Sequence, residues 1–275
     1  MLGTVADAED AVGEAYLRWY RLTAEQRATV VVPRAWLTRV VGRICLDVLG
    51  SARARRERYV GEWLPEPVPA SYAMDGPVPD DPAAAVGLAE SVGTALLVVL
   101  ESLTPAERVV LVLHEVFALP FAEIAEVVDR SAAACRQLAA SARRKLPPAQ
   151  VRAARRSRHD ELARAFAAAC AGGDLGALVA LLDPRVTLHS DGGGAVSAAR
   201  RPVRGAEQVA RFLLGVLAKN PGDAVEEVVV GDGVAYLARE GSRPRALLTL
   251  DGDQAVTTIW IVLNPAKLGR WVDQA

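Results

Sequence analysis

The stretch TPAERVVLVLHEVFALPFAEIAEVVDRSAAACRQLAASARRKL, residues 104–146, decides how the middle of this chain folds. It predicts three consecutive helices, of which the last two form a helix-turn-helix. Thr104 is a favourable N-cap, Pro105 suits the first helical position, and Glu107 completes a capping box with Thr104. The first helix is therefore expected to run to about Phe117.

The second and third helices follow from apolar spacing and from a short turn. A second helix is predicted from Pro120, because apolar residues recur on one helical face at Phe121, Ile124, Ala125 and Val128. Residues 129–131 predict a turn in which Ser131 is the N-cap of the third helix. That third helix should place Cys135, Leu138, Ala142 and Leu146 inward, and Arg136, Gln137, Arg143 and Arg144 outward.

The composition of the third helix favours DNA binding. A helix-turn-helix holds its second helix so that the exposed face fits the major groove. Arginine and glutamine pair with base edges, and lysine and arginine neutralise phosphates. No acidic residue occurs between Arg130 and Arg158, a segment with eight arginines and one lysine. A helical hairpin with a solvated basic face is the simpler alternative, but the capping box, the short turn and the acid-free helix together favour DNA.

Length and composition limit the classes of protein. The 275 residues suit two or three domains, and 51% of them are hydrophobic, so each domain can bury a core. The net charge of −1 means that any nucleic-acid binding must come from local basic segments. The three cysteines lie far apart and indicate reduced thiols in a cytoplasm. The three histidines have no metal-ligand spacing, the first residues predict no signal peptide, and no apolar run has membrane-spanning length.

The N-terminal block predicts two helices. The first, residues 7–20, has an acidic start and an apparent apolar face of Val5, Ala8, Val12, Tyr16 and Trp19. The second spans roughly residues 33–49, with Trp36, Val40, Ile44 and either Asp47 or Val48 in helical steps. The basic run that follows, residues 51–58, either contacts nucleic acid or is a solvated helix end.

A proline-rich linker is predicted at residues 61–82, because six prolines there oppose helix and sheet. Its Trp63-Leu64 pair is expected to dock on another part of the protein, since a large apolar pair is costly to leave in water. Helix is expected again at residues 83–103.

The last third of the chain predicts an α+β domain. After a basic connector at 148–158, helices are expected at 161–171, 174–182 and 206–217. Short strands are expected at 186–190, 225–230, 234–239, 246–250 and 256–263, with hairpin turns at 231–233 and 251–253. Helices combined with an antiparallel meander form an α+β unit.

These segments together resemble the extracytoplasmic-function (ECF) sigma factors. Residues 7–12 (DAEDAV) and 33–47 (PRAWLTRVVGRICLD) are similar to sigma domain 2, and residues 103–146 to sigma domain 4. The last third resembles a SnoaL-like cone, which one ECF subgroup carries as an extension. That subgroup has a WLPEP motif, here Trp63, Leu64, Pro65, Glu66 and Pro67. It also has a DGGGK-like motif, here Asp191, Gly192, Gly193, Gly194 and Ala195, and an NPDKL-like motif, here Asn264, Pro265, Ala266, Lys267 and Leu268.

The resemblance implies a multidomain fold in which two all-α sigma domains precede an α+β SnoaL-like cone. The expected boundaries are 1–60 for domain 2, lacking its opening helix, 61–82 for the linker, and 83–147 for domain 4. The connector then spans 148–158 and the cone 159–275.

The resemblance also implies partners and roles. Core RNA polymerase would contact Asp7, Glu9, Asp10, Val12 and Glu14. Promoter DNA would contact Ser131, Ala132, Ala133, Arg136, Gln137, Ala140, Arg143 and Arg144 in domain 4, and Arg53, Arg55 and Arg56 in domain 2. The three motifs would join the linker to the cone and regulate activity inside one chain.

Three positions depart from the family pattern. Gly50 and Ser141 stand where an arginine is common, so two contacts with the DNA backbone are expected to be absent. Ala195 replaces the lysine of DGGGK, a charge that could have paired with Glu66.

The cone leaves functional alternatives open. His189 or Asp191 could act as an acid or base in an isomerase-like pocket. We favour His189 as an ordinary strand residue and Asp191 as the start of a turn, because no second acid–base partner is apparent. The triglycine run lacks the Lys-Ser/Thr of a phosphate loop. We therefore predict a cytoplasmic transcription initiation factor without cofactor or metal, and not an enzyme. The alternatives are a SnoaL-type isomerase or hydrolase, or a ligand-sensing domain, fused to a DNA-binding helix-turn-helix.

Overall fold

The computed structural model describes residues 1–56, 59, 61–69, 94–146, 149–230 and 233–272, without the side chains of residues 52–56, 95 and 149–157. The chain forms two compact units. We call residues 1–58 and 98–147 the helical unit, and residues 59–97 and 148–275 the cone unit. The predicted linker after residue 69, the predicted helix before residue 94 and the turn residues Gly231 and Asp232 lie outside the described residues.

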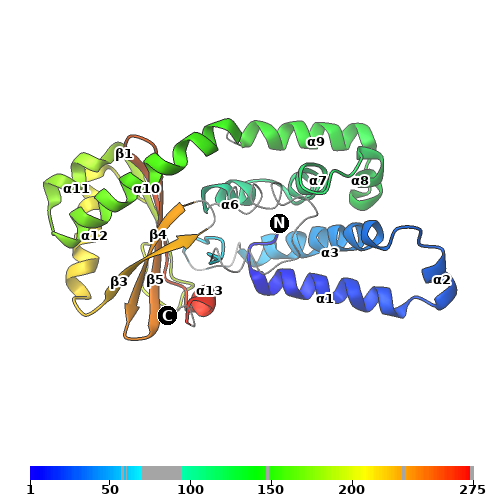
Figure 1. Ribbon diagram of the computed structural model, residues 1–275, viewed down its shortest axis with the longest axis horizontal. Helices are drawn as coiled ribbons and strands as arrows, with labels where there is room; N and C mark the ends of the chain where they lie inside the picture. Colours follow the sequence, from blue (N-terminus) through cyan, green and yellow to red (C-terminus); the bar gives the residue numbers. More distant parts are fainter. Residues whose placement is uncertain (57–58, 60, 70–93, 147–148, 231–232, 273–275) are drawn as a thin grey trace. The chain divides into compact units, whose positions relative to one another are not determined.

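Six described helices belong wholly to the helical unit, and a seventh, α6, is divided equally between the two units (Figure 1). They are α1 (Val5–Arg21), α2 (Ala24–Ala28), α3 (Pro33–Arg56), α6 (Thr94–Glu101), α7 (Pro105–Glu115), α8 (Phe121–Val128) and α9 (Ala132–Lys145). The three helices predicted between residues 104 and 146 are confirmed as α7, α8 and α9, and α7 ends two residues earlier than expected. The short helix α2 was not predicted.

Side-chain caps stabilise the first turn of several of these helices. The hydroxyls of Thr4, Thr23, Thr104 and Ser131 each accept a hydrogen bond from a backbone amide in the first turn of the following helix. Two of them, Thr23 and Thr104, form complete capping boxes with Gln26 and Glu107. Such caps satisfy amides that would otherwise lack partners at a helix start.

The predicted apolar face of α1 was wrong. The buried residues are Ala11 and Ala15, whereas Val12 and Tyr16 are 45% and 48% exposed. The helix packs against α3, and two alanines give that contact a narrow buried stripe. Large apolar side chains on the neighbouring stripe therefore stay in solvent.

Helix α3 joins the N-terminal helices to the helix-turn-helix. It is longer than predicted, because the basic run continues the helix to Arg56. Leu49 enters the same core as Val109, Val110 and Leu113 of α7. At Gly42, a side-chain Cβ would lie only 3.1 Å from a methyl of Val127 and 3.2 Å from a methyl of Leu113. Glycine is thus what lets α3 approach α7 and α8 closely.

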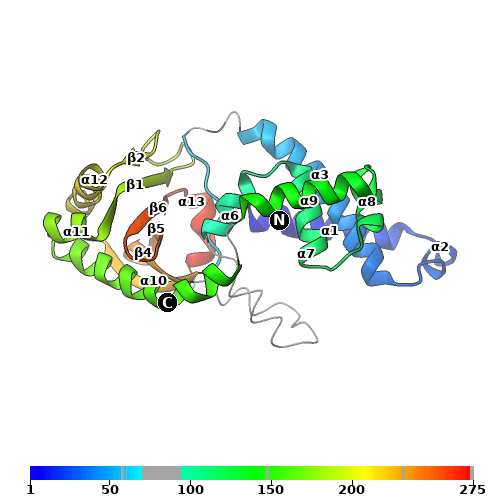
Figure 2. The ribbon, with the colours of Figure 1, turned by 90° about the horizontal axis from the view of Figure 1, so that it is seen from above.

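The cone unit is a curved sheet with helices on one face (Figure 2). Its strands are β1 (Leu182–Asp191), β2 (Val203–Arg204), β3 (Ala224–Val230), β4 (Gly233–Glu240), β5 (Arg243–Gly252) and β6 (Val256–Val262). The strand order is β2-β1-β6-β5-β4-β3. The predicted antiparallel meander is confirmed for β3 to β6, while β1 pairs in parallel with β6. Neither that pairing nor the short β2 was predicted.

Helices α10 (Ala149–Ala171), α11 (Leu175–Leu181) and α12 (Ala206–Lys219) cover one face of the sheet. The core between them includes Phe166, Leu178, Leu188, Val209 and Ile259. The predicted connector at 148–158 is helical from Ala149 onward, where it forms the first part of α10. A run rich in alanine and arginine has strong helix propensity, so it continues the helix.

The opposite face of the sheet carries a different set of residues. Side chains alternate along a strand, so His189 and Asp191 of β1 point away from the helical core that contains Leu188. On this side lie the short helix α13 (Pro265–Leu268), the 3-10 turn η1 (Gly269–Trp271) and the extended segment 61–69. Trp260 and Trp271 are buried. No helix in the described ranges is long and apolar enough to cross a bilayer.

Two glycines of α3 give a matched test of this packing. Gly42→Leu should lower the free energy of unfolding by about 1–3 kcal/mol, because the new side chain must push Val127 and Leu113 aside. Gly50→Leu, at a position where a Cβ meets nothing within 4 Å, should be neutral or stabilise by up to about 1 kcal/mol. Urea unfolding followed by circular dichroism measures both, and equal effects would contradict the close approach at Gly42.

Candidate nucleic-acid interface

The turn between α8 and α9 fixes the direction of the second helix. Asp129 ends α8 in the left-handed conformation, at φ 52°, and Ser131 then caps α9 by accepting from the Ala134 amide at 3.1 Å. Ile124 and Val128 of α8 and Cys135 and Ala139 of α9 share one core. The turn and the core together hold α9 against α7 and α8.

One stripe of α9 is exposed and basic. Ala133, Arg136, Gln137, Ala140 and Arg144 follow one another at helical spacing and are all exposed. Arg136 and Arg144 have no ion pair within the described part of the chain. Ser131 is also exposed, and Ala132 is half-buried. The predicted DNA-contacting residues of α9 therefore lie mostly on one accessible face, and the alanines allow close approach.

Arg143 lies off that stripe. It forms an ion pair with Glu115 of α7, and both side chains are about half exposed. An ion pair so exposed is worth little, because water screens it and two long side chains must be held in place. Arg143 can therefore exchange its carboxylate for a phosphate at small cost.

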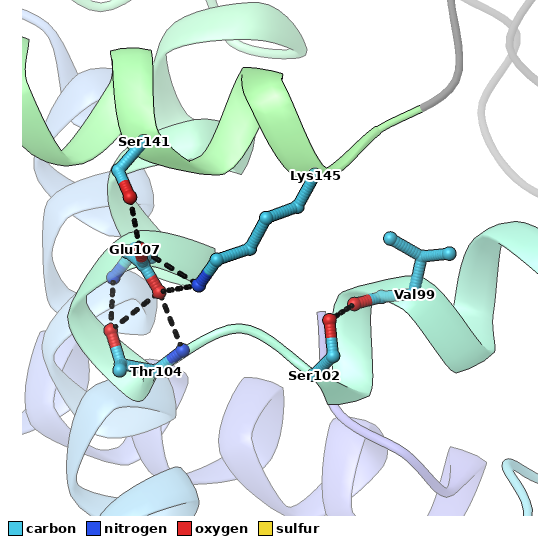
Figure 3. A network of polar contacts seen from close by, with 6 residues as sticks. All are labelled: Val99, Ser102, Thr104, Glu107, Ser141 and Lys145. Atoms are coloured by element: carbon cyan, nitrogen blue, oxygen red, sulfur yellow. Dashed lines mark hydrogen bonds and ion pairs between the residues drawn. The ribbon is translucent and has the colours of Figure 1, made fainter.

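The inner side of α9 meets a carboxylate on α7 (Figure 3). Ser141 Oγ donates to Glu107 Oε1 at 2.7 Å, and Lys145 Nζ lies 3.1 and 3.0 Å from the two oxygens. The Thr104 amide donates to Glu107 Oε2 at 2.9 Å as part of the capping box. Ser141, which stands where the family often has arginine, is thus an internal contact.

Hydrogen bonding keeps Glu107 ionised. Burial by itself would raise the pKa of this carboxyl, but the donors from Thr104, Ser141 and Lys145 outweigh it and lower the pKa to about 2. Because the folded pKa lies below the usual value, the carboxylate stabilises the fold at pH values above the ordinary glutamate range. That contribution is lost as the pH falls towards 2.

The structure describes the other predicted contact residues of the helical unit only in part. Arg53, Arg55 and Arg56 lie in the last turns of α3, and their side chains are outside the described residues. Glu9, Asp10 and Val12 of α1 are exposed, while Asp7 accepts from the hydroxyl of Thr4 at 2.7 Å and Glu14 pairs with Arg18 at 2.9 Å.

Sequence reasoning missed an exposed apolar patch on α1. Tyr16, Leu17 and Tyr20 are 48%, 52% and 68% exposed and follow Val12 at helical steps. The sequence predicts the apolar face that contains Val12 and Tyr16, but it does not show that this face is exposed.

In the cone unit, the three motifs meet around one buried carboxylate. Asp191 is fully buried, and its Oδ2 accepts from the Leu64 amide at 2.9 Å and from Lys267 Nζ at 2.6 Å. Its Oδ1 accepts from the Tyr59 hydroxyl at 2.6 Å and from the Gly193 amide at 3.0 Å. Burial, followed by the bond to Asp191, raises the pKa of Tyr59 above its usual range.

Lys267 links the same carboxylate to the WLPEP segment. Its ammonium donates to the Leu64 carbonyl and lies 4.0 Å from the centroid of the Trp63 ring. Farther along, Trp271 Nε1 donates to the Pro67 carbonyl at 3.0 Å. A cation over an indole face adds electrostatic attraction to these hydrogen bonds.

Two predictions about this region need correction. Asp191 does lie directly before a turn, but it was expected to have no second acid–base partner, and Lys267, 76 residues later in the chain, is one. His189 was expected to be an ordinary strand residue, yet its Nδ1 lies 3.0 Å from the Glu62 carboxylate. Both were missed because their partners are remote in sequence.

The triglycine run has a steric role. Gly193 has φ 64°, and a Cβ there would lie within 2.4 Å of the Asn264 side chain. Asn264 in turn donates to the Tyr59 hydroxyl at 2.9 Å and caps α13. Because Ala195 replaces a lysine, the sequence predicted that Glu66 would lack an ion pair with that position. In the structure, the Glu66 carboxylate lies 3.6 Å from the Arg270 side chain.

Comparison with known proteins agrees with both halves of the helical unit. A family model for sigma-70 region 2 matches residues 1–56, and one for sigma-70 region 4 matches residues 94–146. The ECF RNA polymerase sigma factor SigJ of Mycobacterium tuberculosis is 44% identical, over 97% of this chain and 87% of that protein. The chain belongs to the ECF sigma factors.

Two further similarities extend this assignment. The probable ECF sigma factor SigI of Mycobacterium tuberculosis is 42% identical, over 70% of this sigma factor and 63% of that protein. The crystal structure of Mycobacterium tuberculosis SigJ matches with a TM-score of 0.70 at 40% identity, covering 98% of this chain and 91% of that one. The predicted multidomain fold, with an α+β domain after the sigma domains, is confirmed.

The family assignment gives the general function. This sigma factor directs promoter-specific initiation of transcription and is not an enzyme. Core RNA polymerase and promoter DNA are the partners that membership in the family implies.

The buried pair of Asp191 and Lys267 can be tested by a double-mutant cycle. Asp191→Asn or Lys267→Met alone should cost about 3–5 kcal/mol, because each leaves a buried charge without its partner. The double variant should cost clearly less than the sum of the two. Urea unfolding followed by tryptophan fluorescence measures the cycle, since Trp63 lies beside the pair. Additive losses would show that the two side chains do not interact.

Proposed function

We propose that α9 reads the upstream promoter box and that the cone regulates this sigma factor by holding the linker. The exposed face with Arg136, Gln137 and Arg144 carries the first part of the proposal. The burial of Asp191 among donors from the linker and from α13 carries the second.

The chemistry of α9 suits a duplex. Arg136 and Gln137 are near the N-terminal half of the helix, where the recognition helix of a helix-turn-helix meets base edges. Ser131, Ala132, Ala133 and Ala140 supply a hydroxyl and small side chains next to them. Arg143 and Arg144, in the last turns, suit phosphates.

Domain 2 has the roles that its family implies. The exposed part of α1, with Glu9, Asp10 and Val12, contacts core polymerase, and the adjoining Tyr16 and Tyr20 enlarge that surface. Asp7 and Glu14 belong to the same polymerase-binding surface, while Asp7 is bonded to Thr4 and Glu14 to Arg18. The basic end of α3, with Arg53, Arg55 and Arg56, lies near the melted strand. A protein with these proposed partners acts in the cytoplasm, with the polymerase and the chromosome.

The linker contact supports a regulatory role for the cone. Tyr59 follows Arg56, the last residue of α3, by three positions, so the chain is held by the cone almost as soon as α3 ends. The WLPEP residues from Trp63 to Pro67 are then anchored by Asp191, Lys267 and Trp271. A linker fixed at this point limits how far domain 2 moves while domain 4 is bound to DNA.

A small ligand in the cone is the alternative regulator. The hydroxyl of Tyr236 is buried and makes no hydrogen bond within the described residues. Burial, followed by the charge of Glu227, raises the pKa of Tyr236 to about 12, so the group is a neutral donor. A ligand with an acceptor at that hydroxyl would raise the melting temperature of the wild type but not of Tyr236→Phe.

The promoter-reading proposal is tested with the full chain bound to core polymerase. The holoenzyme should select a promoter from a random DNA library and start transcription from it. Arg136→Ala should weaken promoter binding by about 1–3 kcal/mol if it contacts a base, and should flatten the salt dependence if it contacts phosphate. Arg211→Ala, an exposed arginine paired with Glu207 in α12, is the matched control. Failure to bind core polymerase, or no effect of Arg136→Ala, would contradict the proposal.

The regulatory proposal predicts a change in transcription when the linker is released. Deleting the residues after Asn264 removes Lys267, Arg270 and Trp271 and with them their contacts to the linker. Transcription from the selected promoter should change in amount, whereas binding of core polymerase should persist. The same assay on Arg211→Ala gives the baseline, and unchanged output would show that the tail does not regulate.

A further inference from the structure

The inner side of α9 is fastened to the start of α7 through one carboxylate. Ser141 and Lys145 are four residues apart, so both side chains leave α9 on the same side and meet Glu107 (Figure 3). Glu107 belongs to the first turn of α7, where the Thr104 amide and hydroxyl bind its other oxygen. A single rigidly held group therefore sets both the rotation and the axial position of α9.

The charge on Lys145 is already matched inside the protein. The Glu107 side chain is 6% exposed, so its carboxylate depends on protein donors. Moving Lys145 to a DNA phosphate would remove a cation from a buried carboxylate, which is unfavourable. Arg143 differs, because its partner Glu115 is half exposed and water can replace the arginine.

We propose that Glu107, acting through Ser141 and Lys145, is the positioning residue that seats α9 for base readout, and that Lys145 serves this contact instead of a phosphate. The proposal rests on the proposed function of α9 as the reader of the upstream box. It divides the basic residues of α9 into DNA contacts on the exposed face and one lysine that acts inside the fold.

The chain itself suggests the variant for the test. Glu107→Gln removes the charge but keeps a capping box, because Thr23 and Gln26 form one at the start of α2. Lys145→Met keeps the length of the side chain, and Ser141→Ala removes the hydroxyl. Glu207→Gln, in the cone unit, is a control that also removes one negative charge. Circular dichroism melting confirms that each variant is folded.

The experiment measures binding by each full-length variant in complex with core polymerase. The probes are the promoter duplex that the wild type selects and a scrambled duplex of equal composition, titrated at several salt concentrations. For Lys145→Met and Glu107→Gln the ratio of promoter to scrambled affinity should fall by about tenfold. For Lys145→Met the slope of log affinity against log salt should equal that of the wild type. The double variant of Lys145→Met and Glu107→Gln should lose no more of this affinity ratio than either single variant. Glu207→Gln should have the affinity ratio of the wild type.

The outcomes separate this inference from the proposed function. A slope that becomes shallower by about 0.9 in Lys145→Met, with the affinity ratio unchanged, would make Lys145 a phosphate contact and overturn the inference alone. Additive losses in the double variant would also overturn it. If the wild-type complex selects no promoter, the proposed function fails and the inference fails with it.

Discussion

Asp191 is buried completely, and a buried carboxylate is tolerated only when donors surround it. Its four donors are Tyr59, Leu64 of the linker, Gly193 in the loop that follows β1 and Lys267 of α13, and Leu64 and Lys267 lie 203 residues apart in the chain. Removing any one of these segments leaves the carboxylate partly unsatisfied. The buried carboxylate therefore couples the stability of the cone to that of the WLPEP segment.

The helical unit uses the same physics at Glu107. There the carboxylate belongs to the capping box at the start of α7. It also accepts hydrogen bonds from Ser141 and Lys145 of α9. A capping residue ordinarily serves its own helix only. Glu107 also binds α9, because Ser141 and Lys145 of that helix donate to its carboxylate (Figure 3).

The two sites serve different parts of the proposed function. The linker lies between the two sigma domains, and in the proposal its contact with the cone affects how these domains reach polymerase and DNA. The position of α9 would affect which sequence is read. In each case a buried carboxylate holds two segments of the fold together. Arg136 and Arg144, by contrast, stay exposed and available for DNA.

The sequence by itself determined the local elements and the family. Capping at Thr104 and Ser131, apolar periodicity in α8 and hairpin turns in the cone are encoded within a few residues, so the helix-turn-helix and the meander could be predicted. The motifs at Trp63, Asp191 and Asn264 identified the subgroup.

The tertiary structure alone decided which charges meet. Asp191 and Lys267, or Glu107 and Lys145, have no signal at fixed spacing, because their contact depends on how sheets and helices pack. For the same reason the buried stripe of α1 was misjudged, since burial depends on the neighbour that packs there and not on hydrophobicity alone.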